Sequence, residues 1–290
     1  MPVRSLVPAM TVAVAAACIA CAPAAAAQPS DAALRTTYEK VAPSLANSPF
    51  GRPIVLTSGE TANGLKGEVY GVLEHPLARV SATLEKLANW CDMLMLHLNN
   101  RACRVDEGKR MLVLSVVRRY DVPVEQAFML TFHFRLVSAK PDYFDAKLNS
   151  GDGPLGTRNY RISVEGIPVE NGKSFIHFSY AYDQGSATRV ATQSYLATFG
   201  RGKVGFTVIG KQPSGDPELV GGMLGLVERN AMRYFLAVDA YLAAPDAFEK
   251  RLSFWYAATE KYPRQLHDLS EADYFKFKRM DRERQGRPPS

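Results

Sequence analysis

Hydrophobic and polar positions near the C-terminal end of the chain follow the period of one long amphipathic helix. Apolar residues recur every three or four positions from Pro217 to Ala244, while Glu228 and Arg229 fall on the opposite side. Pro217 suits a first helical turn, and Pro245 suits a stop. A helix of this length would run about 40 Å, so it needs a broad surface on which to bury its apolar stripe.

The preceding segments alternate apolar and polar residues with the period of two that is typical of strands. Asp152-Gly153 and Asn171-Gly172 stand between such segments, and both pairs are strong hairpin signals. Strands are predicted over 54–56, 64–73, 112–120, 127–137, 143–149, 157–169, 174–182 and 204–209. The pattern predicts an α+β fold in which a curved antiparallel β-sheet wraps around the long C-terminal helix.

Helical spacing also predicts several shorter helices. They lie over 31–45, from residue 77 onward, over 90–98, 187–199 and 248–260, and from residue 270 onward. The helices between 77 and 98 form a corner between the first long strand and the remaining strands. The last two form an extension after the long helix.

The first 27 residues are typical of a cleaved signal peptide. Arg4 supplies a positive charge, an Ala/Val-rich apolar stretch follows, and Ala25-Ala26-Ala27 fits a cleavage site before Gln28. A single membrane anchor and a lipoprotein signal at Cys18 or Cys21 are the alternatives. No later stretch is apolar for about 18 residues. We therefore expect a periplasmic or secreted protein.

Export changes the expected chemistry of the two remaining cysteines. Cys91 and Cys103 are the only cysteines after the signal peptide, and an exported pair tends to be oxidised. A disulfide closing a loop of about 12 residues contributes roughly 3 kcal/mol of stability. We expect a disulfide that staples the helical corner to the next strand, with two unpaired buried thiols as the alternative.

The order of elements resembles the helix-grip fold of the START / Bet v 1-like superfamily. The resemblance is carried by Glu68–Pro76 (EVYGVLEHP), which leads into a helix containing Ala88–Cys91 (ANWC), and by the closing amphipathic helix. It covers residues 61–244, and the chain departs from the simple pattern by an insert over 184–210 and by its C-terminal extension. The resemblance implies a sheet that grips the last helix around an apolar pocket, usually for lipids, sterols or polyketides. Some relatives carry out cyclisation or hydrolysis there.

The predicted domain organisation follows from this resemblance. The chain divides into a signal peptide (1–27), an N-terminal extension (28–60), a START-like helix-grip domain (61–244), and a C-terminal helical extension with a basic tail (245–290). Tyr274, Phe275 and Phe277 precede the basic tail, which favours contact with anionic lipid head groups, and a solvated end is the alternative. The net charge of +6 is modest, so we expect no nucleic-acid partner.

Two strings that look like nucleotide-binding motifs fail on their context. Gly151–Gly156 fits G-x-G-x-x-G, but it joins two strands and contains Pro154. Gly166 with Gly172-Lys173-Ser174 has one residue too many for a phosphate loop. The five histidines lack metal-ligand spacing, and the sequence has no G-x-S-x-G elbow. We expect no cofactor and no metal.

Mostly apolar side chains with a few polar groups are the usual lining of a ligand pocket. The residues predicted to line such a pocket are Met129, Phe132, Phe134, Arg135, Tyr160, Arg161, Phe178, Tyr180, Met223 and Phe235. Arg135, Arg161 and Tyr160 are the predicted polar anchors.

Three hypotheses about function follow. The favoured one is an exported binding protein for an apolar small molecule, with a lipid as the first choice, held between the sheet and the long helix. The second is an enzyme of the cyclase or hydrolase type on the same scaffold, with His133, His177, Arg135 or Tyr160 as acid–base or anchoring groups. The third is an envelope interaction protein whose pocket is filled by its own side chains.

Overall fold

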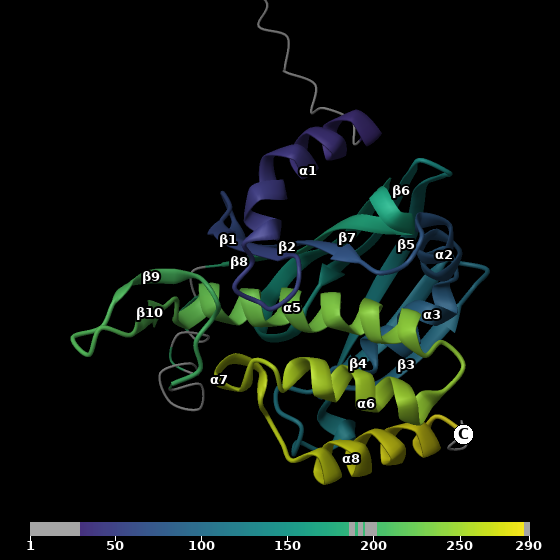
Figure 1. Cartoon of the computed structure of the whole chain (residues 1–290). Helices are drawn as coiled ribbons and strands as arrows, with labels where there is room; N and C mark the ends of the chain where they lie inside the picture. Colours follow the sequence, from purple (N-terminus) through teal and green to yellow (C-terminus); the bar gives the residue numbers. More distant parts are fainter. Residues whose placement is uncertain (1–29, 186–188, 191–193, 195–201, 287–290) are drawn as a thin grey trace, which may run out of the picture.

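The computed structural model describes residues 30–185, 189, 190, 194 and 202–286. Within them the chain forms an eight-stranded antiparallel sheet that curves around one long helix, α5 (Gly222–Ala243) (Figure 1). This is the helix-grip arrangement expected from the sequence. The predicted signal peptide and most of the predicted helix over 187–199 lie outside the described residues.

The strand order in the sheet is β1-β2-β8-β7-β6-β5-β4-β3. The strands are β1 (Ile54–Glu60), β2 (Gly64–Leu73), β3 (Asn100–Asp106), β4 (Met111–Val116), β5 (Phe128–Lys140), β6 (Tyr143–Asp152), β7 (Thr157–Val169) and β8 (Lys173–Gln184). From β3 to β8 each strand pairs with its neighbour in sequence, and β2 pairs with β8 along its whole length. Strands from the beginning and the end of the sheet-forming sequence therefore lie side by side.

The turn between β7 and β8 has the backbone conformation that its Asn-Gly pair predicts. Asn171 and Gly172 both have positive φ, 59° and 68°, and asparagine and glycine are the residues that adopt this left-handed conformation most readily. Val169 pairs with Lys173 across the turn, so the turn sets the register of the whole hairpin. The short 3₁₀ helices η1 (Val124–Gln126), η2 (Pro154–Gly156) and η3 (Glu170–Gly172) lie in such connections.

The long helix begins five residues later than the sequence predicts. Pro217–Leu219 forms a short strand, β10, which pairs with β9 (Val208–Lys211) in a separate hairpin that projects from the body (Figure 1). Gly221 is extended and Gly222 has a φ of 56°, so the backbone becomes helical only after these two glycines. The predicted strand over 204–209 is also misplaced, since only its last two residues belong to β9.

The two edge strands differ most from the sequence prediction. The sequence predicts a strand only over 54–56, but β1 pairs with β2 along seven residues. It predicts no strand at β3, and β4 ends at Val116 rather than at residue 120. Through β1, part of the predicted N-terminal extension joins the main sheet.

The remaining helices cover the sheet and α5 from different sides (Figure 1). They are α1 (Asp31–Ala46), α2 (Leu77–Leu84), α3 (Leu87–Leu94), α6 (Phe248–Thr259), α7 (Pro263–Leu266) and α8 (Glu271–Arg284). Leu34 and Leu45 of α1 pack on the outer face of the sheet against Tyr143 and Phe175. Among the described helices, none has both the length and the apolar composition needed to cross a bilayer.

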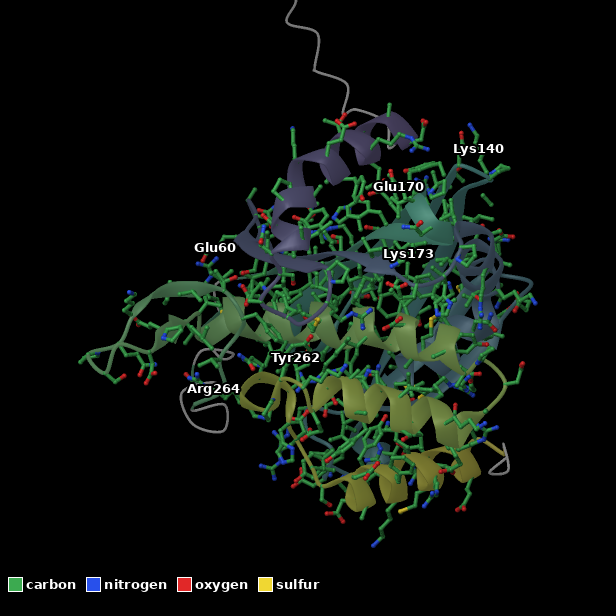
Figure 2. The ribbon with its side chains drawn as sticks, in the orientation of Figure 1. Glu60, Lys140, Glu170, Lys173, Tyr262 and Arg264 are labelled. Atoms are coloured by element: carbon green, nitrogen blue, oxygen red, sulfur yellow. A yellow bond between two sulfur atoms is a disulfide. The ribbon has the colours of Figure 1, made fainter. Side chains whose placement is uncertain are left out.

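Side chains fill most of the space between the sheet and α5 (Figure 2). Trp90, Phe132, Phe178 and Phe235 are among the largest fully buried side chains of this core. Tyr262, labelled in Figure 2, donates a hydrogen bond to the backbone oxygen of Phe50 at 2.9 Å. The C-terminal extension is thus tied to the segment that precedes β1.

Candidate ligand cavity

A cavity of about 180 Å³ remains between α5 and the concave face of the sheet. Its lining comes from strands β3, β4, β5, β7 and β8, from helices α3, η2 and α5, and from the segments that follow α3 and β4. The lining residues are Leu94, His97, Asn99, Asn100, Leu114, Val116, Val117, Arg118, Leu130, Phe132, Pro154, Tyr160, Ile162, Tyr180, Leu226, Asn230 and Tyr234. Arg118 is exposed whereas the other described lining residues are buried or half-buried, so the cavity opens beside Arg118.

Alternation along the strands supplies the apolar half of the lining. Leu114 and Leu130 are direct partners across β4 and β5, and Phe132 lies two residues further along β5. Ile162 contributes from β7. All four side chains are almost completely buried, and they share the concave face because alternate residues of a strand point to the same side.

The polar side chains of the lining lie close to one another, with the rings of His97 and Tyr180 both near that of Tyr234. His97 comes from the turn after α3 and Asn100 is the first residue of β3, while Asn230 and Tyr234 lie one turn apart on α5. Tyr180 reaches the same region from β8. The cavity therefore combines apolar walls with one polar cluster, called the polar side below, that offers imidazole, amide and hydroxyl groups.

His97 is held neutral in this setting. Burial is the main reason that its pKa falls to about 3, and the cationic Arg233 acts in the same direction. The Nδ1 atom accepts a hydrogen bond from the backbone N–H of Asn99 at 3.2 Å. A neutral imidazole that accepts at Nδ1 carries its proton on Nε2. That N–H is left for the side chain of Asn230, which is within hydrogen-bonding reach, or for a ligand.

Three tyrosines also line the cavity and stay protonated. The ring centroids of Tyr160 and Tyr180 are 6.1 Å apart, and those of Tyr180 and Tyr234 are 5.7 Å apart. Burial raises the pKa of Tyr234 to about 12 and raises the pKa of Tyr180 well above its usual value. The Tyr160 hydroxyl lies 2.9 Å from that of Thr157. Each phenol can donate or accept a hydrogen bond without carrying charge.

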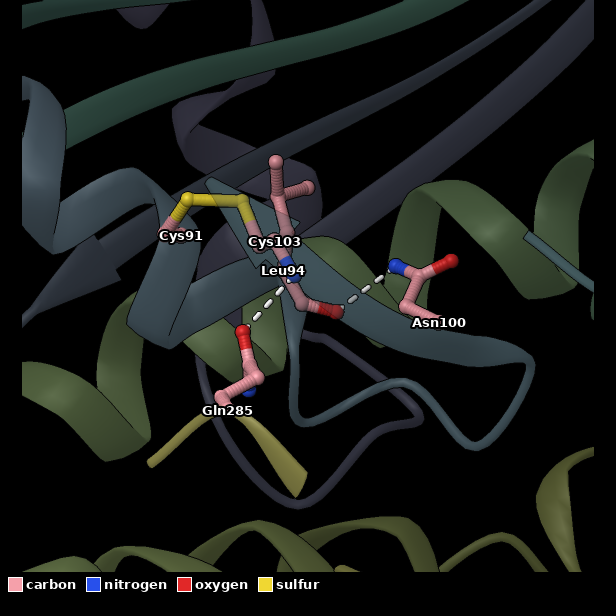
Figure 3. Close-up of a disulfide and its surroundings, with 5 residues drawn as sticks. All are labelled: Cys91, Leu94, Asn100, Cys103 and Gln285. Atoms are coloured by element: carbon pink, nitrogen blue, oxygen red, sulfur yellow. Dashed lines mark hydrogen bonds between the residues drawn. A yellow bond between two sulfur atoms is a disulfide. The ribbon is translucent and has the colours of Figure 1, made fainter. Parts of the chain in front are cut away.

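The cavity wall beside these polar groups, formed by the segment from α3 to β3, is held by a disulfide and by hydrogen bonds. Cys91 of α3 and Cys103 of β3 form the expected disulfide (Figure 3). The amide nitrogen of Asn100 donates to the backbone oxygen of Leu94 at 2.7 Å, and the backbone N–H of Cys103 donates to Oε1 of Gln285 at 2.8 Å (Figure 3). The turn between α3 and β3 is therefore fixed covalently and by hydrogen bonds.

Chemically, the cavity combines apolar walls with uncharged hydrogen-bonding groups, which suits recognition of a mostly apolar molecule. Among the described residues, no group of three or more His, Cys, Asp or Glu side chains is placed to hold a metal ion.

No family model matches the sequence, and no curated protein matches it. Solved structures do match. A protein from Thermus thermophilus is 11% identical, over 67% of this chain and 100% of that chain, with a TM-score of 0.38. Ara h 8.0201 is 8% identical, over 66% and 99%, with a TM-score of 0.36. Norcoclaurine synthase from Thalictrum flavum is 15% identical, over 51% and 80%, with a TM-score of 0.33. The helix-grip fold rests on the strand order and on the position of α5.

Phe132, Tyr160 and Tyr180 are the residues of the predicted lining that border the cavity. Three other predicted residues are buried in the surrounding core, namely Phe134, Phe178 and Phe235. Met223 lies at the start of α5, with its sulfur 3.9 Å from the amide nitrogen of Gln184.

The other three predicted residues lie on the outer face of the sheet. Met129 is 47% exposed, and Arg135 is also exposed. Arg161 forms an ion pair with Asp183 at 2.8 Å. Phe132 and Tyr160, on the same strands, face the cavity. Met129, Arg135 and Arg161 lie an odd number of positions away from them, so alternation places these three on the opposite face.

The residues named for the enzyme hypothesis and for lipid contact are also placed. His133 is exposed on the outer face, and His177 lies there between two glutamates. Tyr274 is buried, and its hydroxyl donates to the backbone oxygen of Leu96 at 2.9 Å. Tyr274 therefore packs inside the protein, and contact of the tail with lipid stays a prediction.

Sequence reasoning missed the polar side of the cavity. His97, Asn100, Asn230 and Tyr234 were given no role in binding. His97 falls in the helix predicted over 90–98 and Asn100 just beyond it, while the other two lie on a helix interpreted as an apolar stripe. The available signal was Asn230, an amide placed one turn after Leu226 and one turn before Tyr234 on the predicted helix.

Proposed function

We propose that the protein binds a compact, mostly apolar molecule that carries a hydroxyl or carbonyl group. The observation that supports this is the two-sided cavity: Leu114, Leu130 and Phe132 meet the apolar body, while His97 and Tyr180 meet the polar group. The uncharged donors and acceptors of this cavity can pair with a hydroxyl or carbonyl group of such a ligand and fix its orientation.

The volume limits the size of the ligand. An apolar cavity of about 150 Å³ is enough for benzene, and this one measures about 180 Å³. It suits a single substituted ring or the end group of a longer molecule that passes out beside Arg118. A whole two-chain lipid is too large for this volume. If the ligand is a lipid, as the sequence predicts, it must be a small one.

Binding is favoured over catalysis by the charge state of the groups in the cavity. Efficient acid–base catalysts have pKa values near the working pH. The pKa of His97 lies far below neutrality, and those of Tyr180 and Tyr234 lie far above it. These groups hold their protons as a fixed set of donors and acceptors.

The proposal includes export to an oxidising compartment. It is supported by the signal-like sequence of residues 1–27 and by the Cys91–Cys103 pairing. Expression of the full chain with a C-terminal tag, followed by fractionation and N-terminal sequencing, tests it. We expect a protein outside the cytoplasm that starts at Gln28, and an uncleaved cytoplasmic chain would contradict export.

Calorimetric titration of the protein with p-cresol and with toluene tests ligand binding. We expect one saturable site for both, with tighter binding of p-cresol because its hydroxyl meets the polar side. Leu114→Phe fills the cavity and should abolish binding, whereas Leu155→Phe, at a 63% exposed position, should leave it unchanged. Absence of saturable binding to either probe by the folded wild type would overturn the proposal.

A further inference from the structure

A buried lysine of α8 reaches the back of the cavity wall. Lys278 is 2% exposed, and its Nζ donates to the backbone oxygens of His97 at 3.0 Å and of Asn100 at 2.8 Å. The same Nζ lies 3.2 Å from Oδ2 of Asp281. His97 and Asn100 border the cavity while their carbonyl groups meet Lys278, so one ammonium group fixes the backbone of both.

Asp281, one turn further along α8, binds the side chain of Arg101, the residue that follows Asn100. Its buried carboxylate accepts at Oδ1 from Nε of Arg101 at 2.8 Å and from Nη1 of Arg284 at 3.0 Å. Arg101 also donates from Nη1 to the backbone oxygen of Tyr120 at 2.9 Å. Asn100 and Arg101, which are consecutive, are thus held by charged groups of the C-terminal extension.

Packing alone does not account for these buried charges. Removing an ammonium and a carboxylate from water is costly, and apolar residues of similar volume are often equally stabilising. An apolar side chain at position 278 would fill the space but would donate to neither carbonyl. The hydrogen bonds of the lysine fix the distance between α8 and the turn after α3. They therefore also fix the positions of the side chains of His97 and Asn100.

We propose that Lys278 is a positioning residue for the ligand cavity, acting through the carbonyl groups of His97 and Asn100. This inference rests on the proposed function and makes the C-terminal extension part of the binding device. It also predicts selectivity. The three hydrogen bonds of the Lys278 ammonium group go to His97, Asn100 and Asp281, whereas Leu114 and Leu130 lie on β4 and β5. Loss of Lys278 should therefore affect a ligand's polar group more than its apolar body.

Titration of the full-length Lys278→Met variant with p-cresol and toluene tests the proposal. We expect p-cresol to bind about tenfold more weakly, the size of one lost hydrogen bond, and toluene to change less than threefold. Arg279→Met is the matched control, because Arg279 is the next residue, is exposed, and pairs with Glu249 on the surface. The control should bind both probes as the wild type does.

The outcomes separate this inference from the proposed function. If the wild type binds neither probe, the proposed function fails. If it binds both and folded Lys278→Met binds p-cresol equally well, or loses both probes equally, the positioning role fails alone. If Lys278→Met does not fold, nitrogen-15 NMR of the wild type decides. Addition of p-cresol should then shift the amide signals of Lys278 and Asp281 together with those of His97 and Asn100, and unmoved signals at Lys278 and Asp281 would overturn the proposal.

Discussion

Each face of the sheet covers one largely buried histidine, and the pKa values of the two histidines shift in opposite directions. On the concave side, burial and then Arg233 lower the pKa of His97 to about 3. On the outer face, burial also lowers the pKa of His177, but hydrogen bonds to Glu165 at 3.1 Å and Glu68 at 2.8 Å outweigh it and raise the pKa.

The difference shows that burial keeps a histidine neutral unless hydrogen-bonded carboxylates outweigh it, as Glu68 and Glu165 do at His177. On the outer face Asp145, Glu165, His177 and Tyr70 are successive partners across four neighbouring strands. Tyr70 stacks on His177 with ring centroids 4.5 Å apart. The concave face around His97 instead offers amides and phenols. The outer face of the sheet thus carries a chain of charged groups, and the cavity on the concave side is lined mainly by uncharged ones.

The largest expected effect is the loss of folding stability at low pH that His97, on the concave side, should cause. The folded pKa of His97, about 3, lies below the ordinary value of 6.5, so the unfolded chain binds more protons between these values. The contribution of neutral His97 is complete above pH 6.5 and is lost as the pH falls towards 3. A shift of this size corresponds to roughly 4–5 kcal/mol. In urea denaturation, the free energy of unfolding of the wild type should fall between pH 7 and pH 4. That of His97→Gln should fall by several kcal/mol less. Equal losses would contradict a neutral buried His97.

Removal of the disulfide should give the next largest change. The bond closes a loop of 12 residues, and its loss costs about 3 kcal/mol in the chain-entropy model. We expect Cys91→Ser combined with Cys103→Ser to lower the free energy of unfolding by this amount at pH 7, and reduction of the wild type to have a similar effect. A loss below about 1 kcal/mol would mean that hydrogen bonds alone hold the cavity wall.

Substitution of His177 should act with the opposite pH dependence. Its raised pKa contributes stability that is complete below pH 6.5 and is lost as the pH rises through the folded pKa. His177→Gln leaves Glu68 and Glu165 without a cation between them. Because these side chains are only partly exposed, we expect the free energy of unfolding to fall by about 2 kcal/mol at pH 5.5. His133→Gln, exposed on the same face, should change stability by less than about 0.5 kcal/mol. A difference between wild type and His177→Gln that grows with pH would contradict this assignment.

Much of the fold was predictable because it depends on local signals. The Asn171-Gly172 turn and the alternation of the long strands predict the hairpins, and the strand order with α5 confirms the helix-grip fold. The start of α5 was not predictable from apolar spacing, because two consecutive glycines, Gly221 and Gly222, decide it. β3 was missed because Asn100–Asp106 lacks clear alternation and is held by its partner β4.

The site was less predictable, for a different reason. Alternation correctly separates Phe132 from Arg135 and Tyr160 from Arg161, so the two arginines cannot share a pocket with the aromatic residues, although the sequence-based list combined them. The polar side depends on contacts between distant segments, such as Lys278 with His97 and Asn100. Such contacts leave no periodic pattern in the sequence.

The smallest expected effect is also the sharpest test of which face binds. Arg161 was predicted to anchor a ligand, yet its side chain is 43% exposed and pairs with Asp183 on the outer face. An exposed ion pair contributes at most about 1 kcal/mol, so Arg161→Met should change the free energy of unfolding by less than that. Its affinity for p-cresol should stay within twofold of the wild type, whereas Tyr180→Phe, facing the cavity, should weaken binding several-fold. If Arg161→Met abolished p-cresol binding while Tyr180→Phe did not, the ligand would lie on the outer face, and the assignment of the two faces would have to be reversed.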